Sequence, residues 1–249
     1  MKIIRFAWVL SKRELQVRYK NSILGVSWTL FQPLSMVALF SLIFTYIFPF
    51  ESTLPKPIFI FSGMICWNLF QLGFYQGSSC LHHQKELILA NKHPLLAYPI
   101  SKWMISVADN LALIPILIFA SLCVNLPISS TWLLIPLAWM PLILFGILTS
   151  ILLSRMTIRF NDILHLLPLL VSISLWVSPV FYSEYMIPND WNFITNWNPI
   201  SQSIITTRRM LMGYWPNTQF YILLGILAPL TFISSKLLSS KHDSLKDYL

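Results

Sequence analysis

Residues 21–50 read NSILGVSWTLFQPLSMVALFSLIFTYIFPF and contain no Asp, Glu, Lys or Arg. A helix needs roughly 20 apolar residues to cross the hydrocarbon core of a bilayer. This stretch is long and apolar enough to cross, so it predicts a membrane-spanning helix and places the chain among integral membrane proteins.

Four further stretches of the chain also lack charged residues. They lie between Lys56 and Lys85, Asp109 and Arg155, Asp162 and Glu184, and Arg209 and Lys236. The Asp109–Arg155 gap could hold two spans, and residues 125–131, NLPISST, divide it as a turn would. Spans in lipid are helices because a helix satisfies its own backbone hydrogen bonds. The sequence predicts an all-α membrane domain over 29–235, with six spans near 29–50, 58–79, 103–124, 132–153, 164–182 and 218–235, and a cytoplasmic tail over 236–249.

Composition excludes a water-soluble fold. Hydrophobic residues make up 56% of the chain, charged residues 10%, and the mean hydropathy is +0.66. Soluble domains carry about 25% charged residues. The three cysteines lie in or near spans and indicate no disulfide framework.

The distribution of basic residues predicts the orientation in the membrane. With the N-terminus in the cytoplasm, only Lys56, Arg208 and Arg209 of the 17 Lys and Arg face outward, which agrees with the positive-inside rule. Both termini are then cytoplasmic. The net charge of +8 reflects this orientation and membrane-lipid contact; it is no nucleic-acid footprint, which needs a clustered basic face.

Residues 1–28 predict an amphipathic helix lying on the inner membrane surface. One face carries Arg5, Lys12, Arg13, Gln16 and Lys20, and another carries Ile4, Trp8, Leu15 and Tyr19. An ordinary basic flank beside the first span is the alternative. Asn21 and Gly25 lie where this helix must turn into the bilayer, and glycine permits a tight bend.

The loop over 81–102 is the longest one on the predicted inner side. Gln84 to Asn91 can form two helical turns, and Pro94 restricts their continuation. His82, His83 and His93 do not complete a metal site, because their spacing is wrong and no carboxylate or cysteine joins them.

The outer segment over 183–217 predicts a helix at 200–213 that is too short to span and dips into the membrane. Arg208 and Arg209 are candidates for binding a phosphate group; contact with lipid headgroups is the alternative.

Trp28, Trp103 and Trp132 fit an aromatic belt at the span ends. Asp109 lies inside a span, where a structural hydrogen bond is favoured over a proton relay.

Five blocks of residues resemble a known family. The blocks are KRELQVRYKNSILGVSWTLFQP at 12–33, RFNDI at 159–163, SPVFY at 178–182, NPI at 198–200 and RMLMG at 209–213. In this order and spacing they resemble type-2 ABC exporter permeases, and most closely the Wzm-like branch that exports O-antigen and other lipid-linked polysaccharides.

The resemblance implies a role for each segment. The loop with Lys85, Glu86, Leu87, Asn91, Lys92 and His93 would carry a coupling helix that docks on an ATPase. An elbow with Arg13, Arg18, Tyr19, Asn21 and Gly25, and a cytoplasmic link with Arg159 and Asp162, would transmit its motion. The re-entrant outer helices would form a gate, and the substrate path would include Trp67, Trp139, Trp176, Tyr182, Arg208 and Arg209. For the three tryptophans, simple helix packing is the alternative.

No phosphate-binding loop occurs, since none of the seven glycines precedes a lysine, and no catalytic constellation appears. The chain is therefore expected to be no enzyme and to hold no cofactor, with ATP and magnesium bound by a separate subunit. The resemblance implies a homodimer with two ATPase subunits in a bacterial inner membrane, moving a polyprenyl-linked polysaccharide. A related permease for teichoic acid or a drug, and a membrane-embedded glycosyl- or acyltransferase, are the alternatives.

Overall fold

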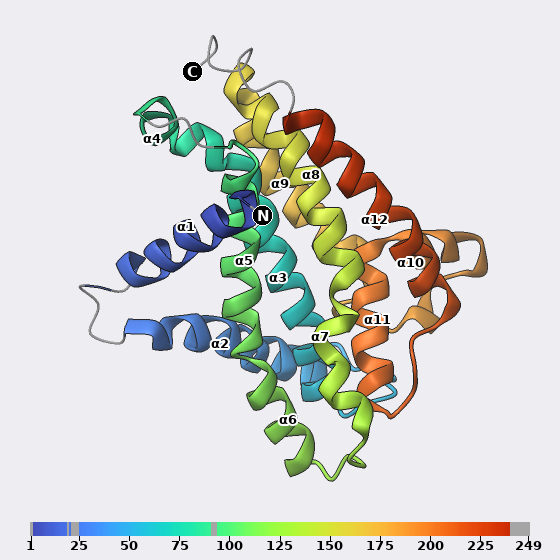
Figure 1. Ribbon diagram of the computed structural model, residues 1–249. Helices are drawn as coiled ribbons and strands as arrows, with labels where there is room; N and C mark the ends of the chain where they lie inside the picture. Colours follow the sequence, from blue (N-terminus) through green and yellow to red (C-terminus); the bar gives the residue numbers. More distant parts are fainter. Residues whose placement is uncertain (1, 19, 21–24, 91–93, 240–249) are drawn as a thin grey trace.

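The computed structural model describes residues 2–18, 20, 25–90 and 94–239, and within them the chain forms helices and no strand (Figure 1). The first half contains α1 Lys2–Arg18, η1 Gly25–Ser27, α2 Trp28–Leu42 with its continuation η2 Ile43–Ile47, α3 Lys56–His83, α4 Lys85–Ala90, α5 Ala97–Leu111 and α6 Ile114–Cys123. The second half contains η3 Ser130–Leu134, α7 Ile135–Ala138, α8 Met140–Arg159, α9 Asp162–Val177, η4 Glu184–Met186, η5 Asn189–Trp191, α10 Asn192–Trp197, α11 Pro199–Leu211 and α12 Thr218–Ser239.

Five helical stretches of the described residues are long and apolar enough to cross a membrane. They are Trp28–Ile47, Lys56–His83, Ala97–Cys123, Ser130–Arg159 and Thr218–Lys236. Helix α9 is apolar but has 16 residues, which rise about 24 Å against a hydrocarbon core of about 30 Å. The expected all-α, multi-pass membrane fold is confirmed, with five full-length spans and a shorter α9.

Several helix ends differ from the expected ones. Helix α3 continues to His83, and α5 already begins at Ala97, so the connection between them is shorter than the expected 81–102 loop. Helix α1 ends at Arg18, well before residue 28. Charge spacing locates the apolar part of a helix, whereas the backbone hydrogen bonds continue into the polar boundary.

Trp103 is buried at the centre of the bundle, where α3 packs against α5 and α8. Its side chain is 1% exposed and its Nε1–H donates to Ser150 Oγ at 3.0 Å. A Cβ added to Gly73 or Gly146 would lie 2.7 or 2.0 Å from the indole. These two glycines therefore form the slot in which the indole of α5 lies between α3 and α8.

Two of the three tryptophans expected in an aromatic belt lie in the protein core. Trp103 is enclosed, and Trp132 is 4% exposed and donates from Nε1 to the carbonyl of Leu211 at 3.0 Å. The belt expectation was wrong for both, because glycines and a free carbonyl of neighbouring helices accommodate the indoles. Trp28 is 45% exposed at the start of α2.

Helix α11 has clear end signals in the sequence. The Asn198 side chain accepts a hydrogen bond from the Ile200 N–H at 3.0 Å, and Pro199 occupies the first turn. Beyond the other end, Gly213 has φ +86, a conformation that glycine adopts readily. The helix packs against α3, α7, α8 and α12.

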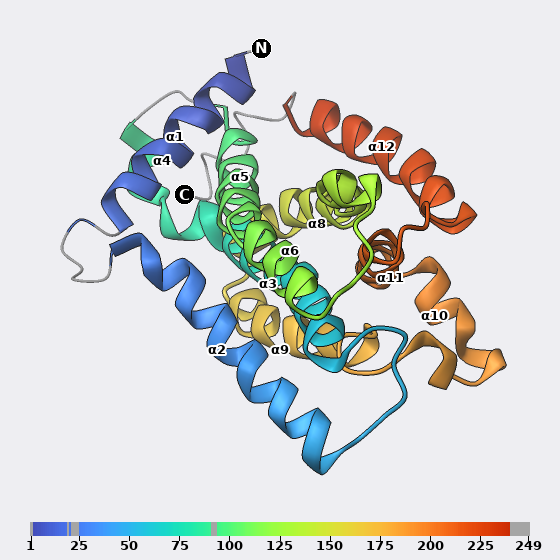
Figure 2. The same cartoon turned by 90° about the horizontal axis from the view of Figure 1, so that it is seen from below.

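Helix α2 lies across the bundle at a steep angle to α3 and α8, as Figures 1 and 2 show. Val37 is its only buried residue within the described part of the chain. Its far end contacts the rest of the protein through aromatic rings, with Phe40 and Phe44 at 4.5 and 5.1 Å from the ring centroid of Phe181.

Three outer helices carry a proline inside the helix: α2 has Pro33, α9 has Pro168 and α12 has Pro229. The prolines of α3 and α8 lie at their first turns, where the missing N–H costs nothing.

Candidate functional site

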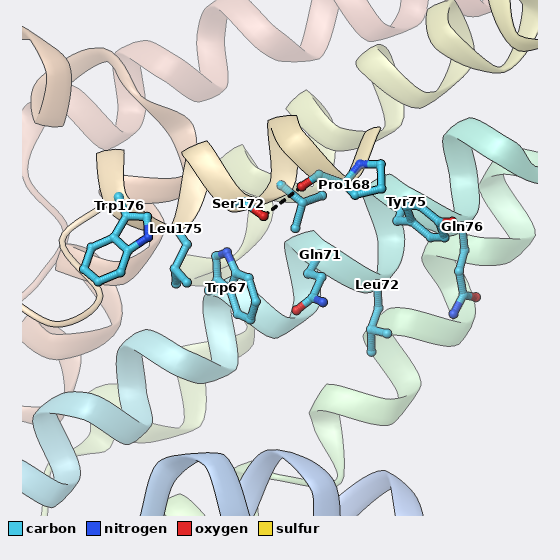
Figure 3. A pocket seen from close by; sticks show the side chains of 10 residues that line it. Trp67, Gln71, Leu72, Tyr75, Gln76, Pro168, Ser172, Leu175 and Trp176 are labelled. Carbon is cyan, nitrogen blue, oxygen red and sulfur yellow. Dashed lines mark hydrogen bonds between the residues drawn. The ribbon is translucent and has the colours of Figure 1, made fainter. Parts of the chain in front are cut away.

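A groove of about 440 Å³ runs between α3 and α9 (Figure 3). Its lining combines aromatic, amide and apolar side chains, which are Trp67, Gln71, Leu72, Tyr75, Gln76, Pro168, Val171, Ser172, Leu175 and Trp176. From Trp67 to Gln76 the α3 wall rises about 14 Å. The groove therefore follows the membrane-spanning part of α3 for about half the bilayer core.

The polar groups of this groove come mostly from α3. Gln71 and Gln76 contribute amides, and Tyr75 contributes a phenol. The Nε1–H of Trp67 is enclosed and has no hydrogen-bond partner among the described residues. On α9, the Ser172 hydroxyl donates to the Pro168 carbonyl at 2.9 Å. The groove thus offers donors, acceptors and aromatic surface at a depth where lipid offers none.

The expected substrate-path residues fall into separate places. Trp67 and Trp176 both line the groove, whereas Trp139 is 1% exposed and lies in the core. The Tyr182 hydroxyl donates to the carbonyls of Trp176 and Val177 at 3.1 Å. Tyr182 therefore provides a hydrogen-bond donor for the last carbonyls of α9, next to the groove.

Arg208 is buried within α11 at 2% exposure. Its Nη2 donates to the carbonyls of Phe59 at 3.2 Å and Val180 at 2.9 Å. The guanidinium carbon lies 3.4 Å from the ring centroid of Phe59, a cation–π geometry. Arg208 thus joins α11 to the start of α3 and to the turn after α9.

Arg209 points the other way. Its Nε donates to the Trp215 carbonyl at 3.1 Å on the exposed side of α11, and the guanidinium lies 5.9 Å from the Tyr214 ring centroid. Of the two adjacent arginines, only Arg209 is on the surface.

Helix α1 is held to α5 by two ion pairs. Lys102 Nζ lies 2.6 Å from Glu14 Oε2, and Arg18 Nη1 lies 2.7 Å from Asp109 Oδ2. Asp109 therefore has a basic partner, which comes from the N-terminal helix and not from another span. This contact supports the structural reading of Asp109.

The face of α1 that packs on α5 is a stripe of small and charged residues. Ala7 and Ser11 are buried, at 0% and 3% exposure, and Glu14 and Arg18 continue the same face. Ile4 and Trp8 are instead about 60% exposed, at 62% and 61%. The expected division of the helix into a basic and an apolar face missed this packing stripe, whose signal was the 7, 11, 14, 18 spacing.

The expected coupling segment is partly described. Helix α4 carries Lys85, Glu86 and Leu87, and Leu87 lines a hollow of about 580 Å³ shared with α1 and α5. Arg13 and Arg18 of the expected elbow line the same hollow, so these two expected sites meet. Asn91, Lys92 and His93, together with Tyr19 and Asn21, lie outside the described residues.

Two further expected positions mark chain turns. Gly25 has φ +51 at the start of η1, which is the left-handed conformation that a tight bend there requires. Arg159 ends α8 and Asp162 begins α9, so the expected link consists of the two residues between them.

The sequence reading missed Gln71, Tyr75, Gln76 and Ser172. The signal was present, since amides inside an apolar span are costly in lipid and face a protein interior or a cavity. Among the described residues, no group of three or more His, Cys, Asp or Glu side chains is placed to share a metal ion.

Comparison with known proteins places this architecture in a family. Residues 5–212 match the family described as ABC-2 type transporter. Two Klebsiella pneumoniae proteins named O-antigen export system permease protein RfbA are each 25% identical, over 220 and 222 residues, covering 87% and 88% of this chain and 83% and 84% of theirs. A Myxococcus xanthus protein of the same name is 24% identical over 176 residues, which are 70% of this chain and 66% of that protein. The chain belongs to the ABC-2 type transporter family.

Proposed function

We propose that this chain is the permease subunit of an ATP-driven exporter that moves a polyprenyl-linked polysaccharide of the O-antigen type across a bacterial cytoplasmic membrane. The observation that carries the proposal is the groove between α3 and α9, with Trp67, Gln71 and Gln76 on one wall and Trp176 on the other. The names of the Klebsiella and Myxococcus relatives support the choice of cargo.

The groove chemistry suits a sugar chain better than an apolar drug. A sugar ring presents hydroxyls at its edge and C–H groups on its faces. Gln71 and Gln76 supply amide donors and acceptors for hydroxyls, while Trp67, Tyr75 and Trp176 supply flat surfaces for the C–H faces. An apolar cargo would leave the amides unpaired in a membrane, at a cost of several kcal/mol.

The topology that supports export has both termini in the cytoplasm. In this orientation α1 and α4 lie at the inner face, where the ends of α8 and α12 place Arg159 and Lys236. Their basic residues satisfy the positive-inside rule. Helices α10 and α11 then lie toward the outer face.

A separate ATPase would dock against α4 and the hollow beneath α1. This hollow lies between α1, the end of α3 and the start of α5, so a force on α4 would reach two membrane-spanning helices at once. ATP and magnesium would be held by that subunit.

A homodimer would enclose the groove. Helix α2 has one buried residue, Val37, and α9 buries only Leu167 and Val171. A two-fold axis next to α2 and α9 would cover both helices and place the grooves of two protomers in one channel.

The test is complementation of a deletion strain. The deletant is expected to lose surface polysaccharide and to accumulate lipid-linked glycan inside the cell. The double variant Gln71→Leu and Gln76→Leu should neither return polysaccharide to the surface nor clear the intracellular glycan. Gln219→Leu, the same chemical change on α12 away from the groove, should do both. Immunoblots of surface and intracellular glycan measure these outcomes.

Normal surface polysaccharide in the deletant would overturn the proposed cargo. Drug sensitivity or loss of teichoic acid in its place would assign the chain to a related permease. Full activity of the double glutamine variant would remove the groove from the path.

A further inference from the structure

A second groove, larger and far more apolar, lies on a different face of the bundle. It has a volume of about 790 Å³ and is bounded by α1, α5, α8 and α12. In Figure 2, α1 and α12 lie along the same side of the bundle and flank α5 and α8. Trp8 of α1 and Phe232 of α12 form its two sides, with 61% and 68% of their surfaces exposed.

The polar groups in this lining are already satisfied. The Thr231 hydroxyl donates to the Ala228 carbonyl at 2.9 Å, and the Ser235 hydroxyl donates to the Phe232 carbonyl at 2.8 Å. The Trp103 indole donates to Ser150. The groove therefore has little to offer a sugar or a phosphate, and in a membrane an apolar hollow of this kind is filled by hydrocarbon.

The length of the groove matches one leaflet. Along α5 it extends from Ile100 to Leu111, a rise of about 16 Å. Half of the hydrocarbon core is about 15 Å. The lining begins at the α1 end of the bundle and ends near its middle, so it accommodates an acyl chain of the leaflet at that end.

Basic residues follow the lining at the α1 end. Arg155 lies one turn beyond Ile151 on α8, Lys236 follows Ser235 on α12, and the exposed Arg5 follows Ile4 on α1. Each of three helices thus carries a basic residue just beyond the lining, at the end where the headgroup of a lipid in the groove would lie. Anionic headgroups are attracted to such clusters.

We propose that the groove between α1 and α12 is a binding site for an anionic phospholipid of the inner leaflet, with its acyl chain against α5 and α8 and its headgroup near Arg155 and Lys236. Helix α1 contacts the bundle mainly through α5, and α12 contacts it mainly through α8 and also through α11 and α10. A lipid in the groove therefore bridges two helices that are otherwise held separately, and it stabilises the position of α1.

The test fills the groove with a side chain. Ala228→Trp and, independently, Ala108→Trp introduce an indole at exposed lining positions outside the packed core. Ile226→Trp is the matched control, since Ile226 is 45% exposed and lies on the opposite face of α12. The full-length protein is purified in mild detergent, and its retained lipids are identified by mass spectrometry.

Wild type and Ile226→Trp are expected to retain phosphatidylglycerol or cardiolipin, and both groove variants are expected to lose it. Thermal unfolding gives a second readout: added phosphatidylglycerol should raise the Tm of wild type and of the control but not of the groove variants. Phosphatidylethanolamine should have no such effect.

Three results would overturn the proposal. These are equal lipid retention by the groove variants and the control, a retained polyprenyl lipid in place of phospholipid, and a loss of dimer in the groove variants with unchanged lipid. The last result would assign the groove to a second copy of the chain. The proposal does not depend on the cargo, so a negative complementation result leaves it intact.

Discussion

Helices α2 and α11 reverse the usual relation between hydrophobicity and burial. Helix α2 is among the apolar spans and buries Val37 alone. Helix α11 contains serine, threonine, glutamine and two arginines, yet every residue except Arg209 is buried. In a membrane, lipid accommodates an apolar surface as well as protein does, so polar residues are the ones that require protein partners. The comparison teaches that, within the membrane domain, polar residues mark the helices that lie in the protein interior.

The largest effect on stability is expected when the packing of α11 against α3 is disrupted. Gly63→Leu would place a Cβ 2.9 Å from the Val180 carbonyl oxygen and 3.0 Å from Arg208 Nη2. Because one of these atoms is backbone, we expect a loss of roughly 3 kcal/mol in the free energy of unfolding. Thermal unfolding in detergent and the monodisperse fraction measure it.

The control for this substitution is Gly225→Leu. A Cβ at Gly225 has no atom within 4 Å, and leucine favours a helix more than glycine does. We expect unchanged or slightly higher stability. Equal stability of the two variants would mean that α11 is not tightly packed at Gly63.

The adjacent arginines provide the next largest effect. Arg208→Ala removes the donor to the Phe59 and Val180 carbonyls. The Phe59 carbonyl still accepts from the Ser62 hydroxyl, so the Val180 carbonyl is the acceptor that loses its side-chain donor, at a cost of about 1–3 kcal/mol. We expect a loss of about 2 kcal/mol. Arg209→Ala, one residue away and partly exposed, should change stability by about 0.5 kcal/mol or less. Similar losses for both would contradict the burial of Arg208.

The smallest effect on stability is expected in α2. Phe31 is 60% exposed, so Phe31→Ala should change the unfolding free energy by about 0.5 kcal/mol or less. If a second protomer covers α2, the same variant should lower the dimer fraction in chemical cross-linking. Phe119→Ala on α6, with a residue 68% exposed, is the control and should leave the dimer unchanged. A stability loss as large as that of Arg208→Ala would show that α2 is packed within one chain.

Much of the fold could be predicted because membrane helices leave simple signals. Charge-free stretches located the apolar helices, and the helix expected at 200–213 corresponds to α11, Pro199–Leu211. These signals are local: they depend on a bilayer thickness and on backbone conformation, and neither needs knowledge of neighbouring helices.

The partners of individual side chains could not be predicted in this way. A tryptophan near a span end suits the membrane interface as well as a slot between glycines, and only the positions of Gly73 and Gly146 decide for Trp103. Asp109 looked isolated because its partner, Arg18, lies 91 residues away on another helix. The α3–α9 groove could not be predicted because its two walls come from helices that are distant in sequence.

The interior prolines divide the molecule by stiffness. A proline removes one backbone hydrogen bond and bends a helix at that point. Pro33, Pro168 and Pro229 therefore give α2, α9 and α12 a compliant point each, while α3 and α8 remain continuous rods. Pro168 lies in the wall of the α3–α9 groove itself. A movement at one end of the bundle would be transmitted along α3 and α8 and would bend α2, α9 and α12 at their prolines. The width of the α3–α9 groove would then change at Pro168, where α9 bends most easily.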